Sequence, residues 1–275
     1  MSFFGSLLKR KGNTAESQSP RLQPLETPKN SLVGTPVCLQ DHGNTVFCCT
    51  FSQGNTGSQA IDLATASYDG TTRVWDVAKC QANAPKKCRR ILQGNVGGVW
   101  CCQYTHDSNY LISGCSKSTI CIYSAAQRYE LLGKQELSHG PNAVFSCNTG
   151  VVGGQNMFAT GGGDSMLKLW SLNTSPGTPR VSPKLQGNFA AHSGDVVSCC
   201  FRPYTNQVLS GSEDRHIRVW DIETQDCVQT LIGHTAEVCS CTFDRHASLL
   251  ASGYSVSWLY WYKSTNSDAT GEQLL

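Results

Sequence analysis

Residues 191–222 read AHSGDVVSCCFRPYTNQVLSGSEDRHIRVWDI, and this stretch decides the fold of the chain. It contains three short apolar segments, VVSCCF, QVLSGS and HIRVW, each of the length of a β-strand. Pro203 and Asn206 separate the first two segments, and Glu213 and Asp214 separate the last two. Short apolar runs bounded by such turn residues are typical of antiparallel strands. The stretch therefore predicts three strands joined by two tight turns.

The same pattern recurs along the chain. An aromatic residue follows each turn position by six residues, in the pairs Asp69–Trp75, Lys117–Tyr123, Asp164–Trp170, Asp214–Trp220 and Val256–Tyr262. A residue with a small hydroxyl stands four positions before each turn position, as Thr65, Ser113, Thr160, Ser210 and Ser252. A period of about 40 residues indicates an array of one supersecondary unit. We place the units at about residues 42–76, 95–124, 139–171, 192–221 and 234–263.

Several dipeptides in these units resemble WD40 repeats. Trp75-Asp76, Trp220-Asp221 and Gly233-His234 match the Gly-His and Trp-Asp frame of that family, in which each repeat forms one blade of four strands. The resemblance covers roughly residues 37–263. It implies an all-β fold, a WD40 β-propeller with five recognisable four-stranded blades. Residues 1–36 are polar and Pro-rich after their first few positions and read as a disordered tail, and residues 264–275 read as a C-terminal tail.

The start of the repeats bears on how the ring closes. Residues 37–41 align with residues 229–233, where the outer strand of one blade leads into the next unit. We therefore expect this N-terminal segment to form the outer strand of the fifth blade and close the ring, as is usual in the family. WD40 rings most often have about seven blades. A closed five-bladed ring, a ring completed by another chain and a shortened product of a longer parent all remain open.

The resemblance also implies one hydrogen-bonded tetrad per blade, made of a His, a Ser or Thr, the turn Asp and the Trp. Such a network pairs polar groups that are costly to bury alone. Three units carry it in full, as His42/Thr65/Asp69/Trp75, His139/Thr160/Asp164/Trp170 and His192/Ser210/Asp214/Trp220. The second unit has Asn95, Lys117 and Tyr123 in the frame, and the fifth has Val256 and Tyr262. We expect these two blades to be the looser ones.

Partners of this family bind mainly on the rim around the mouth of the central channel. The resemblance places an aromatic group and an acidic group at rim positions: Phe47, Tyr68, Trp100 and Phe145, and then Asp195, Glu213 and Glu237. Aromatic anchors beside charges suit a protein or peptide partner. The alternative for Phe47, Trp100 and Phe145 is that they fill the narrow channel as core.

We therefore predict a non-enzymatic scaffold or adaptor that binds proteins through this rim. One alternative is a substrate-receptor subunit of a ubiquitin ligase, although the Trp-Asp-x-Arg motif of such receptors is missing after Trp75 and Trp220. Another is a propeller that binds phospholipid or nucleic acid through the basic loop at residues 77–90 and the Phe/Leu and basic segment at residues 3–11. The net charge of +2 provides no global attraction for nucleic acid.

Composition and motifs argue against membrane-spanning, catalytic and metal-binding functions. No apolar run approaches the ~18 residues of a membrane span, and no phosphate loop, G-x-S-x-G or H-E-x-x-H motif occurs, so we expect no catalytic site and no cofactor. No C-x-x-C pair suggests a metal site among the 15 cysteines. Five of them share one column of the first strand and are expected to pack there as thiols: Cys49, Cys102, Cys147, Cys199 and Cys241.

Reduced thiols indicate a cytoplasmic or nuclear protein. Ser-Pro and Thr-Pro dipeptides add candidate phosphorylation sites at Ser19, Thr27, Thr35, Ser175, Thr178 and Ser182.

Overall fold

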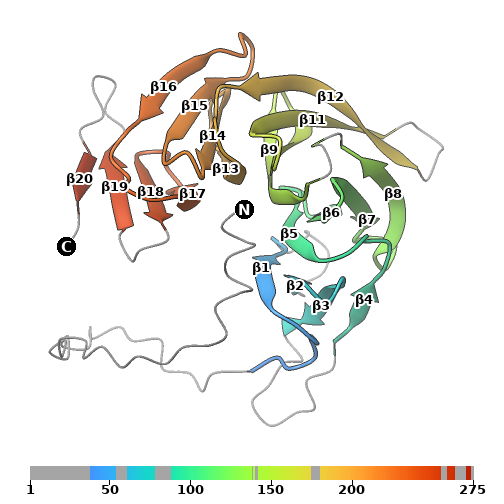
Figure 1. Ribbon diagram of the computed structural model, residues 1–275. Helices are drawn as coiled ribbons and strands as arrows, with labels where there is room; N and C mark the ends of the chain where they lie inside the picture. The colour runs from blue at the N-terminus through green and yellow to red at the C-terminus, as the bar shows by residue number, and fades with distance from the viewer. Residues whose placement is uncertain are drawn as a thin grey trace, which may run out of the picture.

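The described residues of the protein form five antiparallel sheets of four strands each (Figure 1). This computed structural model describes residues 38–53, 61–77, 88–137, 139, 142–174, 180–254, 259–263 and 271–273. Within these ranges every regular element is a strand, so the all-β expectation is confirmed. The same residues contain no helix that is long and apolar enough to span a membrane.

The strands follow one another in chain order within each sheet. The first sheet holds β1 (Val46–Phe51), β2 (Asp62–Ser67), β3 (Thr72–Asp76) and β4 (Arg90–Leu92). The second holds β5 (Val99–Tyr104), β6 (Tyr110–Cys115), β7 (Thr119–Ser124) and β8 (Glu130–Glu136). The third holds β9 (Val144–Val152), β10 (Gln155–Gly162), β11 (Met166–Thr174) and β12 (Val181–Ala190). The fourth holds β13 (Val196–Phe201), β14 (Gln207–Ser212), β15 (Ile217–Asp221) and β16 (Cys227–Leu231). The fifth holds β17 (Val238–Phe243), β18 (Leu249–Tyr254), β19 (Leu259–Lys263) and β20 (Gly271–Gln273).

The sheets are arranged as blades around an axis, with the first strand of each sheet innermost and the fourth outermost (Figure 1). Inner strands contact in succession, β1 with β5, β5 with β9, β9 with β13 and β13 with β17. Because side chains alternate between the two faces of a strand, each blade sends apolar groups toward both neighbours. The core is therefore divided into clusters that lie between blades.

The interface between the second and third sheets illustrates this packing. Ile120 and Ile122 of β7 are buried against Phe158 and Trp170 of the next blade. The remaining clusters join the first sheet to the second, the third to the fourth and the fourth to the fifth. Burial of apolar surface in these layers, at roughly 25 cal/mol per Å², is the main force that holds neighbouring blades together.

Every inner strand carries an irregularity near its start. The register shifts between Val46 and Cys48 in β1, and the same shift follows the first valine of β5, β9, β13 and β17. A β-bulge of this kind re-aims the extra residue. The residues at the shift are Phe47, Trp100, Phe145, Val197 and Cys239. Three of the five are aromatic, and they come from consecutive blades.

The closing strand is the main departure from expectation. The fourth strand of the fifth sheet is β20, which lies in the segment expected to be a C-terminal tail, and it pairs with β19. Residues 38–41, predicted to supply that strand, form no strand, and residues 1–37 lie outside the described ranges. The similarity between residues 37–41 and 229–233 covers only a few positions, and it does not determine whether the first and last blades are joined.

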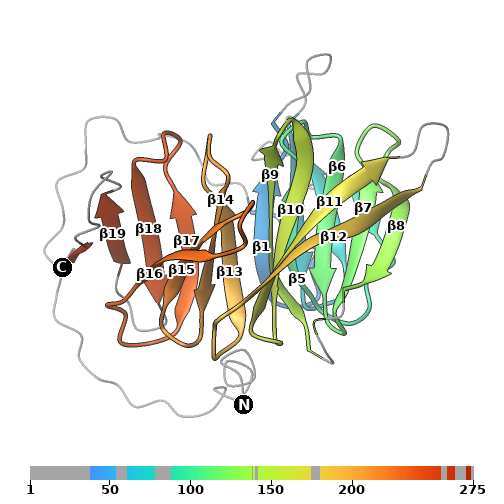
Figure 2. The same cartoon turned by 90° about the horizontal axis from the view of Figure 1, so that it is seen from above.

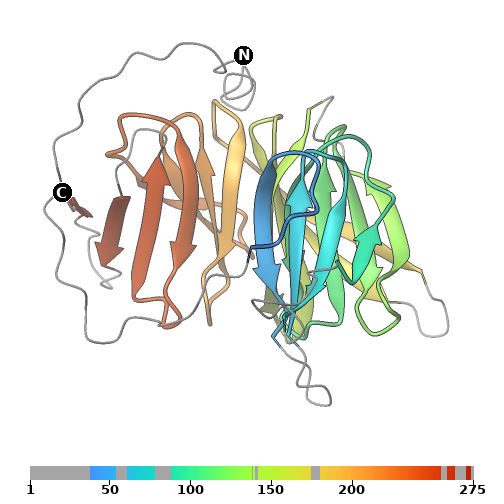
Figure 3. The ribbon, with the colours of Figure 1, turned by 90° about the horizontal axis from the view of Figure 1, so that it is seen from below.

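The ring of described blades is open between the fifth sheet and the first. Figure 3 looks from below at the orange strands of the fifth sheet and the blue β1, which stand apart, and Figure 2 shows the blades from above. Among the described residues, β17 and β1 do not make the extensive contact that joins every other pair of successive inner strands. Val46 at the start of β1 is consequently 46% exposed, whereas Val99, Val144, Val196 and Val238 in the same column are fully buried.

The second blade is better packed than expected. Tyr123, in place of Trp, is 1% exposed, and its hydroxyl donates to the carbonyl oxygen of Gln93 at 3.1 Å. The Ser113 hydroxyl donates to Oδ1 of Asn95 at 2.9 Å. All residues of β7 are buried. The prediction that this blade is loose is wrong, because Asn95 and Tyr123 replace the tetrad with other hydrogen bonds and fill the same space.

Candidate functional site

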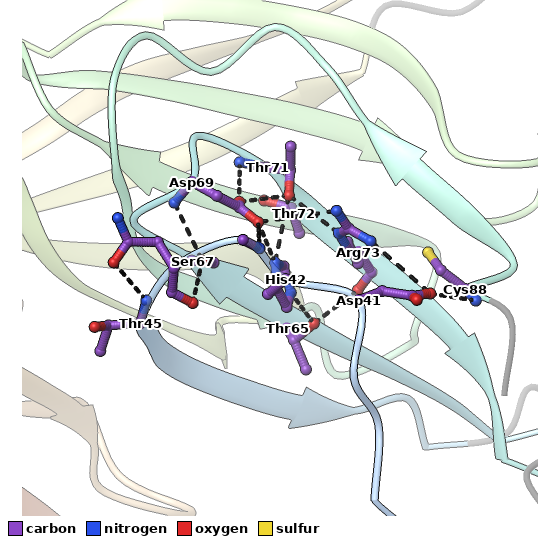
Figure 4. Close-up of polar contacts among 12 residues, drawn as sticks. Asp41, His42, Thr45, Thr65, Ser67, Asp69, Thr71, Thr72, Arg73 and Cys88 are labelled. Carbon is purple, nitrogen blue, oxygen red and sulfur yellow. Dashed lines mark hydrogen bonds and ion pairs between the residues drawn. The ribbon is translucent and has the colours of Figure 1, made fainter.

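The tetrad of the first blade fixes the turn between β2 and β3 (Figure 4). His42 Nδ1 lies 2.8 Å from Asp69 Oδ2, and His42 Nε2 lies 2.7 Å from Thr65 Oγ1. Trp75 Nε1 donates to the same Thr65 oxygen at 2.9 Å. The Thr65 hydroxyl therefore has its own proton to donate to Nε2, which leaves the Nδ1 proton facing the Asp69 carboxylate. Each polar group of the set is satisfied.

The third and fourth blades repeat this geometry. His139 Nδ1 lies 2.7 Å from Asp164 Oδ1 and its Nε2 lies 2.8 Å from Thr160 Oγ1, which also accepts from Trp170 Nε1 at 2.9 Å. In the fourth blade the distances are 2.8 Å for His192 to Asp214, 2.6 Å for His192 to Ser210 and 2.8 Å for Trp220 to Ser210. The fifth blade keeps the contact between His234 Nε2 and Ser252 Oγ at 2.7 Å.

Charge balance around these turns favours ionised aspartates. Burial acts to raise the pKa of Asp164, but hydrogen bonds from His139 and Lys168 outweigh it and lower that pKa to about 2. The pKa values of Asp69 and Asp214 are also lowered, because hydrogen bonds to each carboxylate outweigh its burial. An ionised carboxylate that accepts several hydrogen bonds holds the turn, and the residue before the turn, in one position.

Acid is expected to destabilise the fold in two stages. Burial lowers the pKa of His139 below its ordinary 6.5 despite the nearby Asp164, so stability is complete above that value and is lost as the pH falls below it. The depressed pKa of Asp164 adds stability above its ordinary 3.8 that is lost as the pH falls toward 2. Melting temperatures between pH 7.5 and about pH 2 measure both stages, and a flat profile contradicts the tetrad assignment.

The predicted rim positions lie at the end of each sheet where the inner strand begins. There the residue before the turn aspartate, or its equivalent, pairs through the backbone with the residue that precedes the first strand. The pairs are Tyr68 N to Thr45 O at 2.9 Å, Ser116 N to Gly98 O at 2.9 Å, Gly163 N to Ala143 O at 3.3 Å and Glu213 N to Asp195 O at 3.0 Å. Four blades thus present the same two rim positions, and in the first, third and fourth blades the tetrad holds the adjacent turn.

The structure brings the four predicted aromatic residues together. Phe47 stacks on Trp100 with ring centroids 4.4 Å apart, and Tyr68 meets Trp100 edge-on at 5.7 Å. Phe145, from the third blade, also meets Trp100 edge-on, with ring centroids 5.5 Å apart. Trp100 Nε1 donates to Ser116 Oγ at 3.2 Å. We call these four rings, Phe47, Tyr68, Trp100 and Phe145, the aromatic cluster.

Exposure divides the aromatic cluster into a base and a surface. Trp100 is 9% exposed and forms the base, whereas Phe47, Tyr68 and Phe145 are only partly buried. The Tyr68 ring lies against the backbone of Gly98, where a methyl group would come within 2.5 Å of Cδ2. A side chain at position 98 would push the ring away. The sequence therefore supplies a rigid, partly exposed aromatic surface at the mouth of the channel.

The three predicted acidic residues occupy the fourth and fifth sheets. Burial and the neighbouring Asp164 raise the pKa of Asp195. Burial also raises the pKa of the Cys239 thiol, and the charges of Glu237 and Glu213 add to that shift, so both carboxylates lie near this sulfur. All three carboxylates are partly exposed. We call Asp195, Glu213 and Glu237 the acidic sector.

The cysteine column is buried in four blades and exposed in the first. Cys102, Cys147, Cys199 and Cys241 are between 0% and 9% exposed, whereas Cys49 is exposed. The expectation of a buried thiol is therefore wrong at Cys49, because no described blade covers that face of β1. Every described cysteine is a free thiol, and the described residues contain no group of three His, Cys, Asp or Glu side chains suited to a metal ion.

Other predicted segments lie partly outside the described residues. Residues 1–37, 78–87 and 175–179 include the N-terminal basic segment, most of the basic loop and all candidate phosphorylation sites except Ser182, which lies in β12. At the edge of the basic loop, Arg89 Nη1 contacts both oxygens of Asp62 at 2.8 and 2.9 Å. The Asp62 carboxylate also accepts from Tyr129 at 2.6 Å. Arg89 is thus paired with Asp62 within the same chain, although its side chain is 46% exposed.

The sequence patterns did not predict a cavity that lies at the end of the inner strands away from the rim. It has a volume of about 940 Å³, and its lining includes His106, Arg202, Tyr204 and Arg245. These residues follow the inner strands of three different blades, at turn positions that carry no motif. Only the placement of the blades brings these residues together. In an alignment of the repeats, however, all of them would stand just after the end of the inner strand, and this shared position is a signal that could have found them.

Comparison with known proteins agrees with the repeat geometry. The family described as "WD domain, G-beta repeat" matches residues 32–76, 86–124, 183–221 and 225–258, together more than half of the chain. The third repeat lies between two matched stretches and carries a complete tetrad around His139.

Several curated proteins are similar over most of the chain. WD repeat-containing protein 70 of Xenopus laevis is 25% identical over 219 residues, which cover 78% of this chain and 34% of the relative. Guanine nucleotide-binding protein subunit beta-1 of Drosophila melanogaster is 26% identical over 167 residues, which cover 61% of this chain and 46% of the relative. The chain therefore spans about a third to a half of the length of these relatives. With the family matched over more than half of its residues, the chain belongs to the WD40-repeat family.

Proposed function

We propose that the protein is a non-enzymatic scaffold that binds a protein or peptide segment on the rim formed by the aromatic cluster and the acidic sector. WD40 repeats support a protein-interaction role in general. The observation that carries the specific proposal is the contact of four aromatic rings from three blades, with three carboxylates on the other two blades. One relative is named as a subunit, which supports work within a multiprotein complex.

The chemistry of this rim specifies the kind of segment that it accepts. Partly exposed rings on a buried Trp100 base offer a rigid apolar surface of the type that anchors interface hot spots. The acidic sector attracts Lys or Arg side chains and disfavours acidic ones. We therefore propose a partner segment with one apolar anchor and basic residues that extend across the fourth and fifth sheets. The free thiols support a cytoplasmic or nuclear location for this encounter.

Substituting Tyr68 by alanine is expected to weaken this binding by about 10- to 30-fold, the size of an aromatic hot spot. Peptides selected from a random displayed library on the wild-type protein serve as the probe, and fluorescence polarisation measures their affinity. Tyr204→Ala is the matched control, because Tyr204 is 87% exposed and lines the cavity at the opposite end of the channel. Equal effects of the two substitutions contradict the proposed rim.

The acidic sector is tested separately in the same assay. Glu213→Gln removes one charge while keeping the shape of the side chain, and it is expected to weaken basic peptides more at low salt than at high salt. An affinity that does not depend on salt or on Glu213 leaves the aromatic cluster as the whole of the site.

A further inference from the structure

The open ring carries two unlike ends, which are the outward faces of the first and fifth sheets. On β1, Cys48 points to the second blade, where its sulfur lies 3.4 Å from the Cys102 carbonyl oxygen. Alternation then places Cys49 and Phe51 on the opposite, uncovered face. Phe51 is 58% exposed, whereas the residue in the same position of the second blade, Tyr104, is 3% exposed. Val46, Cys49 and Phe51 define what we call the first-sheet end.

The fifth sheet presents the other end. Val238 and Cys241 of β17 and Leu250 of β18 are buried against the fourth blade. The residues that alternate with them face the opening: Ser240, Thr242, Leu249, Ala251 and Gly253. Ser240 and Thr242 are exposed and Leu249 is 40% exposed. We call this set the fifth-sheet end.

Inside the protein, the same two kinds of face pack by one repeated contact. In the second, third and fourth blades a glycine of the second strand receives the first valine of the next blade, and a methyl group placed on Gly114 would lie 2.8 Å from Val144 Cγ1. The corresponding distances are 2.6 Å from Gly161 to Val196 Cγ1 and 2.8 Å from Gly211 to Val238 Cγ1. In these three interfaces the valine therefore packs closely against the glycine. In the first blade Ala66 occupies the column of these glycines, and it is buried in the same cluster as Val99.

Each open end carries one half of this contact. Gly253 occupies the glycine column in the fifth sheet, and no atom of the described residues lies within 4 Å of the position its Cβ would take. Val46 occupies the valine column in the first sheet and is 46% exposed. Among the described residues, the first-sheet end therefore has an uncovered knob at Val46, and the fifth-sheet end has an unfilled hole at Gly253.

One interface also carries a hydrogen bond between inner strands. Between the fourth and fifth blades, the Cys241 amide donates to Ser198 Oγ at 3.0 Å. Ser240 stands in the column of Ser198, and Cys49 stands in the column of Cys241. Both Ser240 and Cys49 are exposed at the open ends. Placing Cys49 over Ser240 would therefore reproduce, between the two ends, the hydrogen bond that joins the fourth and fifth blades.

We propose that the two ends join copies of this chain head to tail, with Val46 of one copy over Gly253 of a second copy. Within one molecule the described parts of the two ends stand apart, so no other described residue fills either half of the contact (Figures 1 and 3). A heterologous joint of this kind leaves one free end of each type. Association therefore continues beyond the dimer as the protein concentration rises.

Light scattering across a dilution series tests the joint with two variants. The wild-type mass is expected to rise above the 29.8 kDa of one chain with concentration. Val46→Asp removes the knob and Gly253→Val fills the hole, so each variant alone is expected to remain a monomer. Mixed in equal amounts, they retain one intact knob and one intact hole, and they are expected to form dimers and nothing larger.

A control substitution and a check of folding accompany this experiment. Val151→Asp changes a 48% exposed valine of the third sheet and is expected to associate like the wild type. Melting temperatures verify that Val46→Asp and Gly253→Val remain folded. A wild-type mass that stays at one chain contradicts the proposal, and an accompanying loss of stability in Gly253→Val then indicates that the ends close within the chain. Association that persists in both single variants, or a mixture that stays monomeric, also contradicts it.

Discussion

Replacing Trp220 by alanine is expected to lower the free energy of unfolding by about 3–5 kcal/mol. Trp220 is 2% exposed and packs beside Phe189 in the cluster between the third and fourth sheets. The substitution leaves a cavity there, and it also removes the indole N–H that Ser210 accepts at 2.8 Å. Because Ser210 and His192 share a hydrogen bond, the loss reaches the turn that Asp214 holds. Urea unfolding followed by circular dichroism measures the change.

A second substitution at the same position separates packing from hydrogen bonding. Trp220→Phe keeps most of the apolar surface but lacks the N–H, and it is expected to cost about 1–3 kcal/mol. The exposed Tyr204 again provides the control, and Tyr204→Ala is expected to change stability by less than about 0.5 kcal/mol. A cost for Trp220→Phe no larger than that of Tyr204→Ala shows that the tetrad does not stabilise the blade.

Valine at position 211 is expected to destabilise the protein by about 1–3 kcal/mol or more, whereas valine at position 253 is expected to change stability by less than about 0.5 kcal/mol. The two glycines occupy the same column of consecutive sheets. A methyl group on Gly211 would lie 2.8 Å from Val238 Cγ1, whereas the described residues leave the space beside Gly253 open. Overpacking at the first site forces the fourth and fifth blades apart.

Comparing the two glycine variants removes the effects they share. Both replace glycine by a β-branched residue in a second strand, so the changes in backbone entropy and strand preference largely cancel. Thermal and urea unfolding of dilute protein give the difference. An equal loss of stability in both variants means that a blade covers Gly253, and it contradicts the open ring.

The tetrads and the strand register are features that could be predicted from the sequence alone. The six-residue step from Asp214 to Trp220 predicts β14 and β15 because a turn Asp and a buried Trp can be recognised without tertiary information. The family resemblance also brings Phe47, Trp100 and Phe145 to one rim, since equivalent positions of successive repeats are neighbours in space. Sequence patterns of this kind encode what happens within a repeat and between consecutive repeats.

Properties that depend on the whole ring lie beyond such patterns. The exposure of Cys49 differs from that of Cys102 only because no described blade covers β1. The source of the fifth sheet's outer strand depends on the path of the chain after β19, which residues 37–41 do not specify. Likewise, the cavity lined by Arg202 and Arg245 arises from turns of separate blades. Each of these features depends on how blades that are distant in the sequence are placed relative to one another.

The central claim is that five blades form an open ring with the outer face of β1 uncovered. Alkylation of the native wild-type protein, with each modified cysteine identified by mass spectrometry, tests this claim most directly. The protein is kept dilute enough that its mass is that of one chain. Cys49 is expected to react rapidly, while Cys102, Cys147, Cys199 and Cys241 in the same column are expected to be protected until the protein unfolds. Protection of Cys49 equal to that of the other four would show that the ring is closed and would contradict the account.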